Sequence, residues 1–214
     1  MLTKRLAAIY ELVEENSVVY DVGSDHAFLP CALVKNKKCP HAFAGDNKKG
    51  PLENAKKNIR AQGLEDQIEA ILYDGIDERI EADTIVLSGL GYYTVEKILD
   101  RADLKKYKEI IVQVNQDVMK LRKYISDHGY AITKEKVVYD GFYYEIVAFS
   151  AHLKGHYSLK ECYLGPLLMK EKDVVYLDSL RQKKKILEDI FAKVAVKDSV
   201  RLTYYEWLKE ILGQ

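Results

Sequence analysis

The sequence has few of the residues that build metal sites. Its 214 residues include three cysteines, at positions 31, 39 and 162, and no two of them stand at CxxC spacing. The five histidines are scattered and form no ligand pair with these cysteines. We therefore expect no metal site. Three scattered cysteines are typical of a reducing compartment, so we expect a cytoplasmic protein.

Long apolar runs and an excess of one charge are also missing. No stretch approaches 18 consecutive apolar residues, and the start, MLTKRLAAIYELVEE, lacks the apolar core of a signal peptide, so we expect no membrane association. The 33 Lys and Arg balance the 33 Asp and Glu. From His152 to Gln214, however, 12 basic residues stand against 9 acidic ones. A basic tail on an acidic body is a weak indication of nucleic-acid binding.

What is present predicts an α/β fold. Hydrophobic residues make up 48% of the chain, enough for a large core. Short apolar stretches alternate with amphipathic ones over the first 150 residues, which is typical of βαβ units and a mostly parallel sheet. We expect strands at 17–21, 42–44, 68–72, 84–87 and 109–114, a closing antiparallel pair at 131–138 and 143–150, and helices at 27–35, 50–63, 95–99 and 118–125.

The pattern changes after position 156. One long helix is expected over Leu168–Val194, because Leu180, Leu187 and Val194 recur there at heptad spacing, and a second helix is expected to be capped by Asp198 or Ser199. Two such helices predict an antiparallel, coiled-coil-like hairpin. We therefore divide the chain into a domain at 1–152 and a helical domain at 153–214.

Polar residues follow four successive predicted strands, where a parallel sheet binds its ligands. They read DVGSD at 21–25, DN at 46–47, DG at 74–75 and SGLG at 88–91. The first turn lacks the GxGxxG of dinucleotide-binding proteins and carries acids that a pyrophosphate tolerates poorly. The pattern favours a positively charged ligand without phosphate, and S-adenosylmethionine fits that description.

Each strand end has an expected role toward this cofactor. Asp21 acts on the ammonium group directly or by orienting its loop, and Gly23 lets the backbone come close. Asp46 accepts from the ribose hydroxyls, and Asp74 accepts from the adenine amino group. The remaining expected cofactor-binding residues are Ser24, Asp25, His26, Asn47, Gly75 and Ser88.

Several of these stretches resemble the bacterial tRNA adenine-22 N1-methyltransferase family. The resemblance lies in DVGSDHAFLP, AGDNKKGPLENAKKNI, YDGI, DTIVLSGLG and IIVQVNQDVMKLRKYISDHGYAI, and it extends to YYEIVAFS and LGPLLMKEK near the tail. It implies a Rossmann-like methyltransferase domain followed by a coiled-coil helical domain, with S-adenosylmethionine as cofactor and tRNA as substrate. We expect a monomer.

Two positions depart from the family pattern. Members usually read GMGG after the fourth strand, where this chain has Gly89-Leu90-Gly91-Tyr92, and QPN after the fifth, where it has Gln113-Val114-Asn115. Tyr92 in place of glycine is the larger change, because it adds a side chain and disfavours positive φ in a loop expected to face the target base.

Adenine N1 carries an in-plane lone pair and needs no deprotonation before it attacks a sulfonium methyl group. The expected catalytic residues, Ser88, Gly89, Asn115 and Asp25, therefore position the base and accept charge from the cationic product. N1 lies on the Watson–Crick edge, so the base must be unpaired and flipped out.

Several side chains keep two interpretations. Tyr92 or Tyr93 stacks on the base or packs the next helix, and Asn115 faces the site or caps a helix. His26 is a structural hydrogen-bonding group or a proton shuttle. The lysines at 183–185 form a solvated face or contact tRNA. As alternative functions we keep a methyltransferase acting on another RNA position or a small molecule, and a non-catalytic cofactor- or RNA-binding protein with Tyr92 filling the old pocket.

Overall fold

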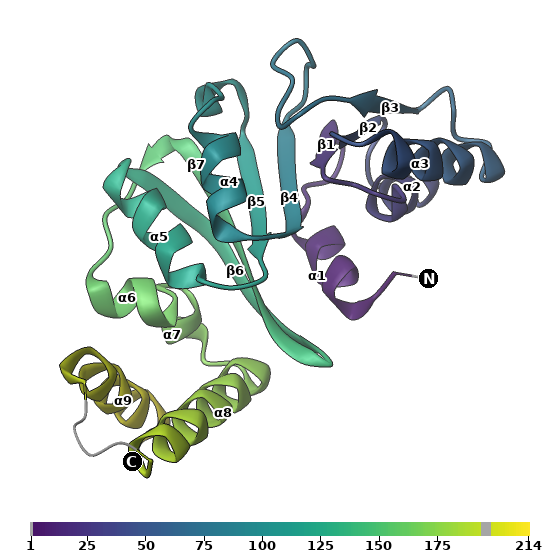
Figure 1. The fold of residues 1–214 in the computed structure, drawn as a ribbon. Coiled ribbons are helices and arrows are strands. Elements are labelled where there is room, and N and C mark those ends of the chain that lie inside the picture. The colour runs from purple at the N-terminus through teal and green to yellow at the C-terminus, as the bar shows by residue number, and fades with distance from the viewer. Residues whose placement is uncertain (1, 194–197) are drawn as a thin grey trace.

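A computed structural model describes residues 2–193 and 198–214. Its centre is a seven-stranded sheet of order β3-β2-β1-β4-β5-β7-β6 (Figure 1). β1 to β5 run parallel, whereas β7 pairs antiparallel with both β5 and β6. The strands are β1 Val19–Val22, β2 Ala42–Asp46, β3 Ile68–Leu72, β4 Thr84–Leu90, β5 Glu109–Val114, β6 Tyr130–Asp140 and β7 Phe142–Lys154. The predicted Rossmann-like sheet is confirmed.

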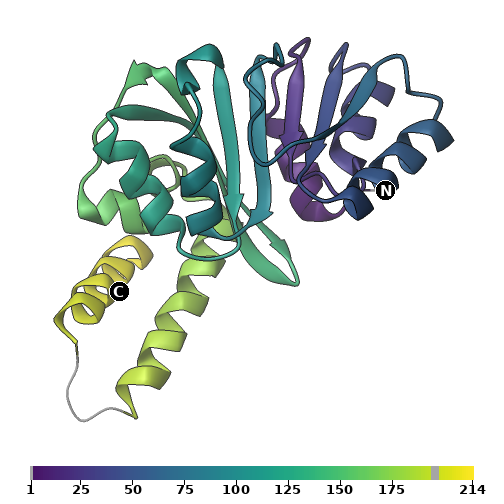
Figure 2. The same cartoon turned by 45° about the horizontal axis from the view of Figure 1, so that its top comes forward.

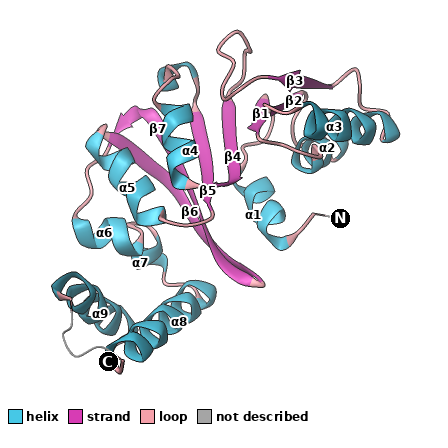
Figure 3. Ribbon diagram, in the orientation of Figure 1, coloured by secondary structure: helices cyan, strands magenta, loops and turns pink. Residues whose placement is uncertain are grey.

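Helices cover both faces of the sheet, as Figure 3 shows by colour. One face packs against α1 (Lys4–Leu12), α2 (Phe28–Lys35) and α3 (Lys49–Ala61). The other packs against α4 (Tyr92–Leu99) and α5 (Val118–Asp127), with a short 3-10 helix, η1 (Leu104–Lys106), between α4 and β5. All four residues of β1 are buried, because a central parallel strand meets helices on both sides.

β4 is longer than predicted. The expected strand at 84–87 continues through the SGLG stretch to Leu90, and the register against β5 shifts between Ser88 and Leu90. Gly89 is the extra residue of this β-bulge, and its φ of 76° suits glycine. The bulge interrupts the regular pairing of β4 with β5 at the carboxyl end of β4, next to the predicted ligand site.

The helix α1 is an addition to the elements predicted from the sequence. It starts after Thr3, whose hydroxyl oxygen accepts a hydrogen bond of 3.2 Å from the backbone N–H of Leu6. Ala8 and Ile9 bury its inner face against the sheet. The segment considered above only as a possible leader is therefore part of the folded domain.

The long helix expected over Leu168–Val194 is wrong. The chain forms a one-turn helix α7 (Leu168–Glu171), breaks at Lys172 with φ of 50°, and starts again as α8 (Val174–Phe191). Asp173 causes the restart, because its carboxylate accepts from the backbone N–H of Tyr176 at 2.7 Å and caps α8. Position 194 lies outside the described residues.

The remaining helices are α6 (Leu159–Leu164) and α9 (Ser199–Leu212), and α9 starts where predicted, capped by Asp198. α8 and α9 pack together around Leu180, Leu187 and Leu208. Val137 and Tyr143 of the β6–β7 hairpin contribute to the same core. Figure 2 shows α8, α9 and the tip of the β6–β7 hairpin projecting beyond the sheet edge toward which β4 and β5 point.

Buried charges join the helical segment to the sheet. Arg122 of α5 is fully buried and donates to Glu135 at 2.6 Å and to Glu145 at 2.7 Å, and Lys183 of α8 donates to Glu145 at 2.5 Å. Burial acts to raise the pKa of Glu145, but the charges of Lys183 and Arg122 outweigh it and hold that pKa at about 2. The network therefore holds α8 against the β6–β7 hairpin.

The boundary expected between residues 152 and 153 stays a prediction. Around it, β7 continues to Lys154 and α6 begins at Leu159. Among the helices of the described residues, none is long and apolar enough to cross a membrane.

Candidate active site

A cavity of about 280 Å³ opens at the carboxyl ends of β1, β2 and β3. Most of the acids predicted for the cofactor lie in its wall, which includes Gly23, Asp25, Asp46, Asn47, Asp74 and Gly75. Three carboxylates in one cavity suit a positively charged ligand and disfavour a phosphate.

The first turn is held tightly against β2. The backbone N–H groups of Gly23 and Ser24 both donate to the carbonyl oxygen of Gly45, each at 2.9 Å. Gly23 has φ of 81°, and a Cβ there would lie 3.5 Å from the side chain of Leu90. The turn therefore brings bare backbone to the cavity, beside the end of β4.

Asp21 lies behind this turn and is buried. Its carboxylate accepts a hydrogen bond of 2.6 Å from the Ser24 hydroxyl. Burial raises the pKa of Asp21 to about 6, although the Ser24 hydrogen bond and the charge of Arg5 oppose the shift. Asp21, Ser24 and His26 do not line the cavity, so the geometry favours the interpretation in which Asp21 orients the loop.

The second and third strand ends are linked side by side. The Asn47 side chain donates to Asp74 at 3.0 Å, and Arg101 of the loop after α4 approaches the other Asp74 oxygen at 3.4 Å. These two hydrogen bonds, that from Asn47 first, lower the pKa of Asp74. Asp46 accepts from the backbone N–H of Lys48 at 2.9 Å, which fixes the entry into α3. Two acids are thus presented on neighbouring strands.

Side chains from β5 hold the bulge at the end of β4. The side-chain oxygen of Gln113 accepts from the backbone N–H of Gly89 at 3.0 Å, and the Asn115 side-chain nitrogen donates to the Gly89 carbonyl at 2.8 Å. The backbone N–H of Asn115 also donates to the carbonyl of Leu90 at 2.9 Å. The Asn115 side chain therefore faces β4 and lies beside Gly89. It does not cap α5, because Asp117 is the residue that immediately precedes that helix.

The two tyrosines at the start of α4 differ in their exposure to solvent. Tyr92 is buried, and its hydroxyl donates to Glu96 at 2.5 Å on its own helix. It does not line the cavity, and its ring packs in the core beneath α4. Tyr93 is 60% exposed, with the ammonium of Lys120 4.7 Å from its ring centre and 2.9 Å from its hydroxyl. Of the two, only Tyr93 offers a ring face to a substrate.

His26 has structural partners. Its ring stacks on Phe28 with centres 5.2 Å apart, its Nε2 lies 3.4 Å from Asp25, and its carbonyl accepts from Asn58 at 2.8 Å. Ser88 pairs with Gln113 in the sheet, one residue before the bulge. Within the described residues no group of three acids, cysteines or histidines could hold a metal ion.

The cavity also has an apolar side that the sequence did not reveal. Its apolar lining residues are Val22, Pro51, Tyr73, Leu90 and Ile98, and Lys48 and Thr94 also line the cavity. Leu90 belongs both to the bulge region of β4 and to this cavity, so it joins the two halves of the site. Leu90 could have been predicted as a site residue from the sequence, because it lies in the SGLG stretch after the fourth predicted strand. Ile98 could be recognised only as a core residue of α4.

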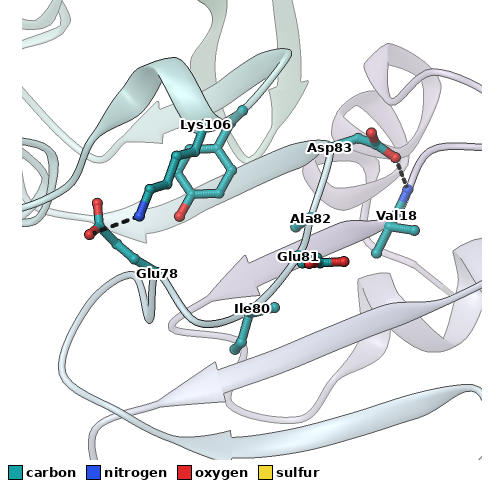
Figure 4. Close-up of a pocket in the computed structure, with 8 residues that line it drawn as sticks. Val18, Glu78, Ile80, Glu81, Ala82, Asp83 and Lys106 are labelled. Carbon is teal, nitrogen blue, oxygen red and sulfur yellow. Dashed lines mark hydrogen bonds and ion pairs between the residues drawn. The ribbon is translucent and has the colours of Figure 1, made fainter.

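A second hollow, of about 520 Å³, lies at the opposite edge, near the amino ends of β1 and β4 (Figure 4). Glu78 and Lys106 pair across it at 3.2 Å, and Asp83 accepts from the backbone N–H of Val18 at 2.8 Å. These contacts hold the loop between β3 and β4 in place. Ligands of open α/β sheets bind at the carboxyl ends, so we assign the smaller cavity as the site.

A family model matches residues 19–211, and its description is tRNA (adenine(22)-N(1))-methyltransferase. The match spans all seven strands and most of the helical tail. The chain belongs to this family. The sheet order, the acidic first turn and the bulged β4 are thus features of a member of this family.

Two kinds of relatives agree. The tRNA (adenine(22)-N(1))-methyltransferase of Bacillus subtilis (strain 168) is 32% identical over 204 residues, covering 91% of this chain and 86% of the relative. A crystal structure from Streptococcus pneumoniae, described as a candidate tRNA (m1A22) methyltransferase, has 30% identity and a TM-score of 0.92, covering 99% of this chain and 100% of the other. A methyltransferase from M. capricolum, solved with S-adenosyl-homocysteine, has 30% identity and a TM-score of 0.80, covering 99% and 95%.

Proposed function

We propose that this chain transfers the methyl group of S-adenosylmethionine to N1 of adenine 22 in tRNA, at the carboxyl edge of β1 to β5. Membership of the family is the observation that carries this function. The acidic cavity fits the cofactor, whose ammonium and sulfonium groups are cations and whose ribose offers two hydroxyl donors.

In this proposal the cofactor lies across the three strand ends. Asp46 accepts from the ribose hydroxyls, and Asp74, held by Asn47, accepts from the adenine amino group. Pro51 and Ile98 supply apolar surface for the adenine ring. Asp25 and the backbone of Gly23 receive the methionine end, with Asp21, Ser24 and His26 holding the turn and Gly75 allowing close approach.

The target adenine lies over the bulge of β4. The cofactor supplies an electrophilic methyl group, and adenine N1 supplies its own lone pair, so the residues of this chain act by placing the base in line with the methyl group. The Gly89 and Leu90 carbonyls already accept from Asn115. Ser88, Asp25 and the side-chain oxygen of Asn115 remain as acceptors for the positive charge that develops on the base.

Tyr93 is the stacking partner for the flipped base. Its ring is exposed at the first turn of α4, immediately after the bulge, and Lys120 holds its hydroxyl. A base taken out of its pair needs such a platform, because unstacking it costs a few kcal/mol.

The tail contributes positive charge toward tRNA. Lys183 and Lys184 of the predicted basic stretch are tied to Glu145 and Glu188, whereas Lys185 is exposed. Lys185 and Arg201 are exposed cations of α8 and α9. These two helices project beyond the same edge as the acceptor site (Figure 2). The three cysteines are buried and unpaired, in keeping with a cytoplasmic protein, and we propose that it acts as a monomer.

A methyl-transfer assay tests the function. The protein is incubated with S-adenosylmethionine carrying a labelled methyl group and with unmodified tRNA, and the modified base is mapped. The proposal predicts one labelled methyl on N1 of adenine 22, and no labelling of a matched transcript with guanine at position 22. Labelling of the guanine transcript would favour another RNA position, and cofactor binding without transfer would favour a non-catalytic protein.

A further inference from the structure

Arg5 of α1 reaches the bulge of β4 from far away in the sequence. Its guanidinium donates to the side-chain oxygen of Gln113 at 2.6 Å. A Cβ placed on Gly89 would lie 2.9 Å from the same guanidinium nitrogen, so Arg5 fills the space beside the bulge. Helix α1 thus extends into the acceptor half of the site.

Arg5 is itself held from the other side by the β6–β7 hairpin. Its backbone N–H donates to Asp140 at 3.2 Å, and its guanidinium lies over the ring of Tyr144 at 5.5 Å from the ring centre. The hydrogen bond holds the Arg5 backbone at the start of α1, and the cation–π contact restricts the otherwise flexible side chain. The guanidinium is therefore presented to Gln113 in a fixed position.

Gln113 links Arg5 to the bulge of β4 at Gly89. It is fully buried, and its side-chain oxygen accepts from both Arg5 and the N–H of Gly89. Its side-chain nitrogen donates to the carbonyl of Val114 at 2.8 Å and approaches the side-chain oxygen of Asn115 at 3.5 Å. A cation next to the Gln113 oxygen disfavours the flipped amide, which would put an NH₂ group against both donors.

We propose that Arg5 is a positioning residue for methyl transfer: through Gln113 it fixes the Gly89 bulge and the Asn115 amide, and so the place of the target base. The inference rests on the proposed function. Because Arg5 contacts Gln113 and does not line the cofactor cavity, we expect its removal to misplace the acceptor and to change cofactor affinity little, and Arg5→Lys keeps the positive charge that acts on Asp21. Small misplacement of reacting groups costs up to about a hundredfold in rate.

The test compares Arg5→Gln and Arg5→Lys with Lys4→Gln, which removes one positive charge from the neighbouring, exposed position of the same helix. Steady-state kinetics on unmodified tRNA give kcat and KM separately, and calorimetry gives cofactor affinity. We expect Arg5→Gln to lower kcat about ten- to a hundredfold, with KM for tRNA and cofactor affinity within about twofold of Lys4→Gln. Arg5→Lys, which keeps a charged donor without the guanidinium geometry, should recover part of kcat.

Combining Arg5→Gln with Gln113→Leu separates action through Gln113 from independent action. If Arg5 acts through Gln113, adding Arg5→Gln to the Gln113→Leu protein lowers kcat no further. If Arg5→Gln does not fold, Arg5→Lys is compared with Lys4→Gln in the same way. Equal kcat for Arg5→Gln and Lys4→Gln overturns the inference, as does a raised KM for tRNA with unchanged kcat, which would make Arg5 a direct tRNA contact. An inactive parent protein would instead overturn the proposed function.

Discussion

The side chain of Asn115 donates a hydrogen bond of 2.8 Å to the carbonyl oxygen of Gly89, and its backbone N–H bonds the next carbonyl, that of Leu90. The end of β5 therefore fixes the end of β4 where the two strands leave the sheet. Because Gly89 is a bulge residue, the side-chain bond from Asn115 replaces the strand pairing that Gly89 lacks.

Asn115→Asp tests this relationship. A carboxylate cannot donate to the Gly89 carbonyl and repels it, so the acceptor loop should shift while the cofactor cavity keeps its shape. We expect kcat for tRNA methylation to fall about ten- to a hundredfold, with cofactor affinity changed by less than about twofold. Calorimetry and steady-state kinetics on the same preparation measure both. Parent-like kcat would show that Asn115 only supports the end of β5.

Asp46→Ala should weaken S-adenosylmethionine binding by about 1–3 kcal/mol, because the ribose hydroxyls lose their acceptor. Glu53→Ala is the matched control, since it removes an exposed carboxylate of α3 that pairs with Lys56. Calorimetric titration with the cofactor measures both affinities. Unchanged affinity in Asp46→Ala would remove Asp46 from the cofactor site.

Asp21→Asn should change stability and binding in opposite directions. The pKa of Asp21 is about 6 in the folded protein, above its unfolded value of about 3.9, so ionisation costs folding free energy above pH 6 and the cost disappears below about pH 4. At pH 7.5 the variant should be about 1–3 kcal/mol more stable to urea than the parent without cofactor, with the difference shrinking at pH 4.5. Asparagine can still accept from Ser24, but the loss of charge should weaken cofactor binding. Lower stability of the variant at pH 7.5 would contradict this account of Asp21.

Lys185→Glu combined with Arg201→Glu should weaken tRNA binding and make it less sensitive to salt, because two exposed cations of the tail become anions. Lys105→Glu is the control, at the exposed end of η1 near the amino edge of the sheet. Filter binding of tRNA at several salt concentrations measures the effect. Equal affinity and equal salt slope in all three proteins would show that the helical tail has only a structural role.

Much of this fold could be predicted from the sequence, because buried parallel strands and acids at their ends follow local patterns. Gly23, Asp46 and Asp74 were predicted for this edge, and the structure brings them to one cavity wall. Arg5 could not be found in this way, since its contact with Gln113 spans 108 positions and depends on where α1 packs. The break at Lys172 was missed because the apolar residues of 168–171 were joined to the heptad series that begins at Leu180, whereas Asp173 caps a separate helix.

The central claim is that the bulge of β4 places the methyl acceptor, and Gly89→Val tests it most directly. A β-branched side chain is strained at φ of 76° and would displace Arg5, whereas Gly63→Ala, at φ of 67° with open space around it, controls for backbone strain alone. The measurement is the single-turnover rate of methyl transfer to tRNA with saturating cofactor. The account predicts a rate about a hundredfold below the parent, cofactor affinity nearly unchanged, and parent-like behaviour of Gly63→Ala. A folded Gly89→Val protein that methylates tRNA at the parent rate would contradict it and place the acceptor elsewhere.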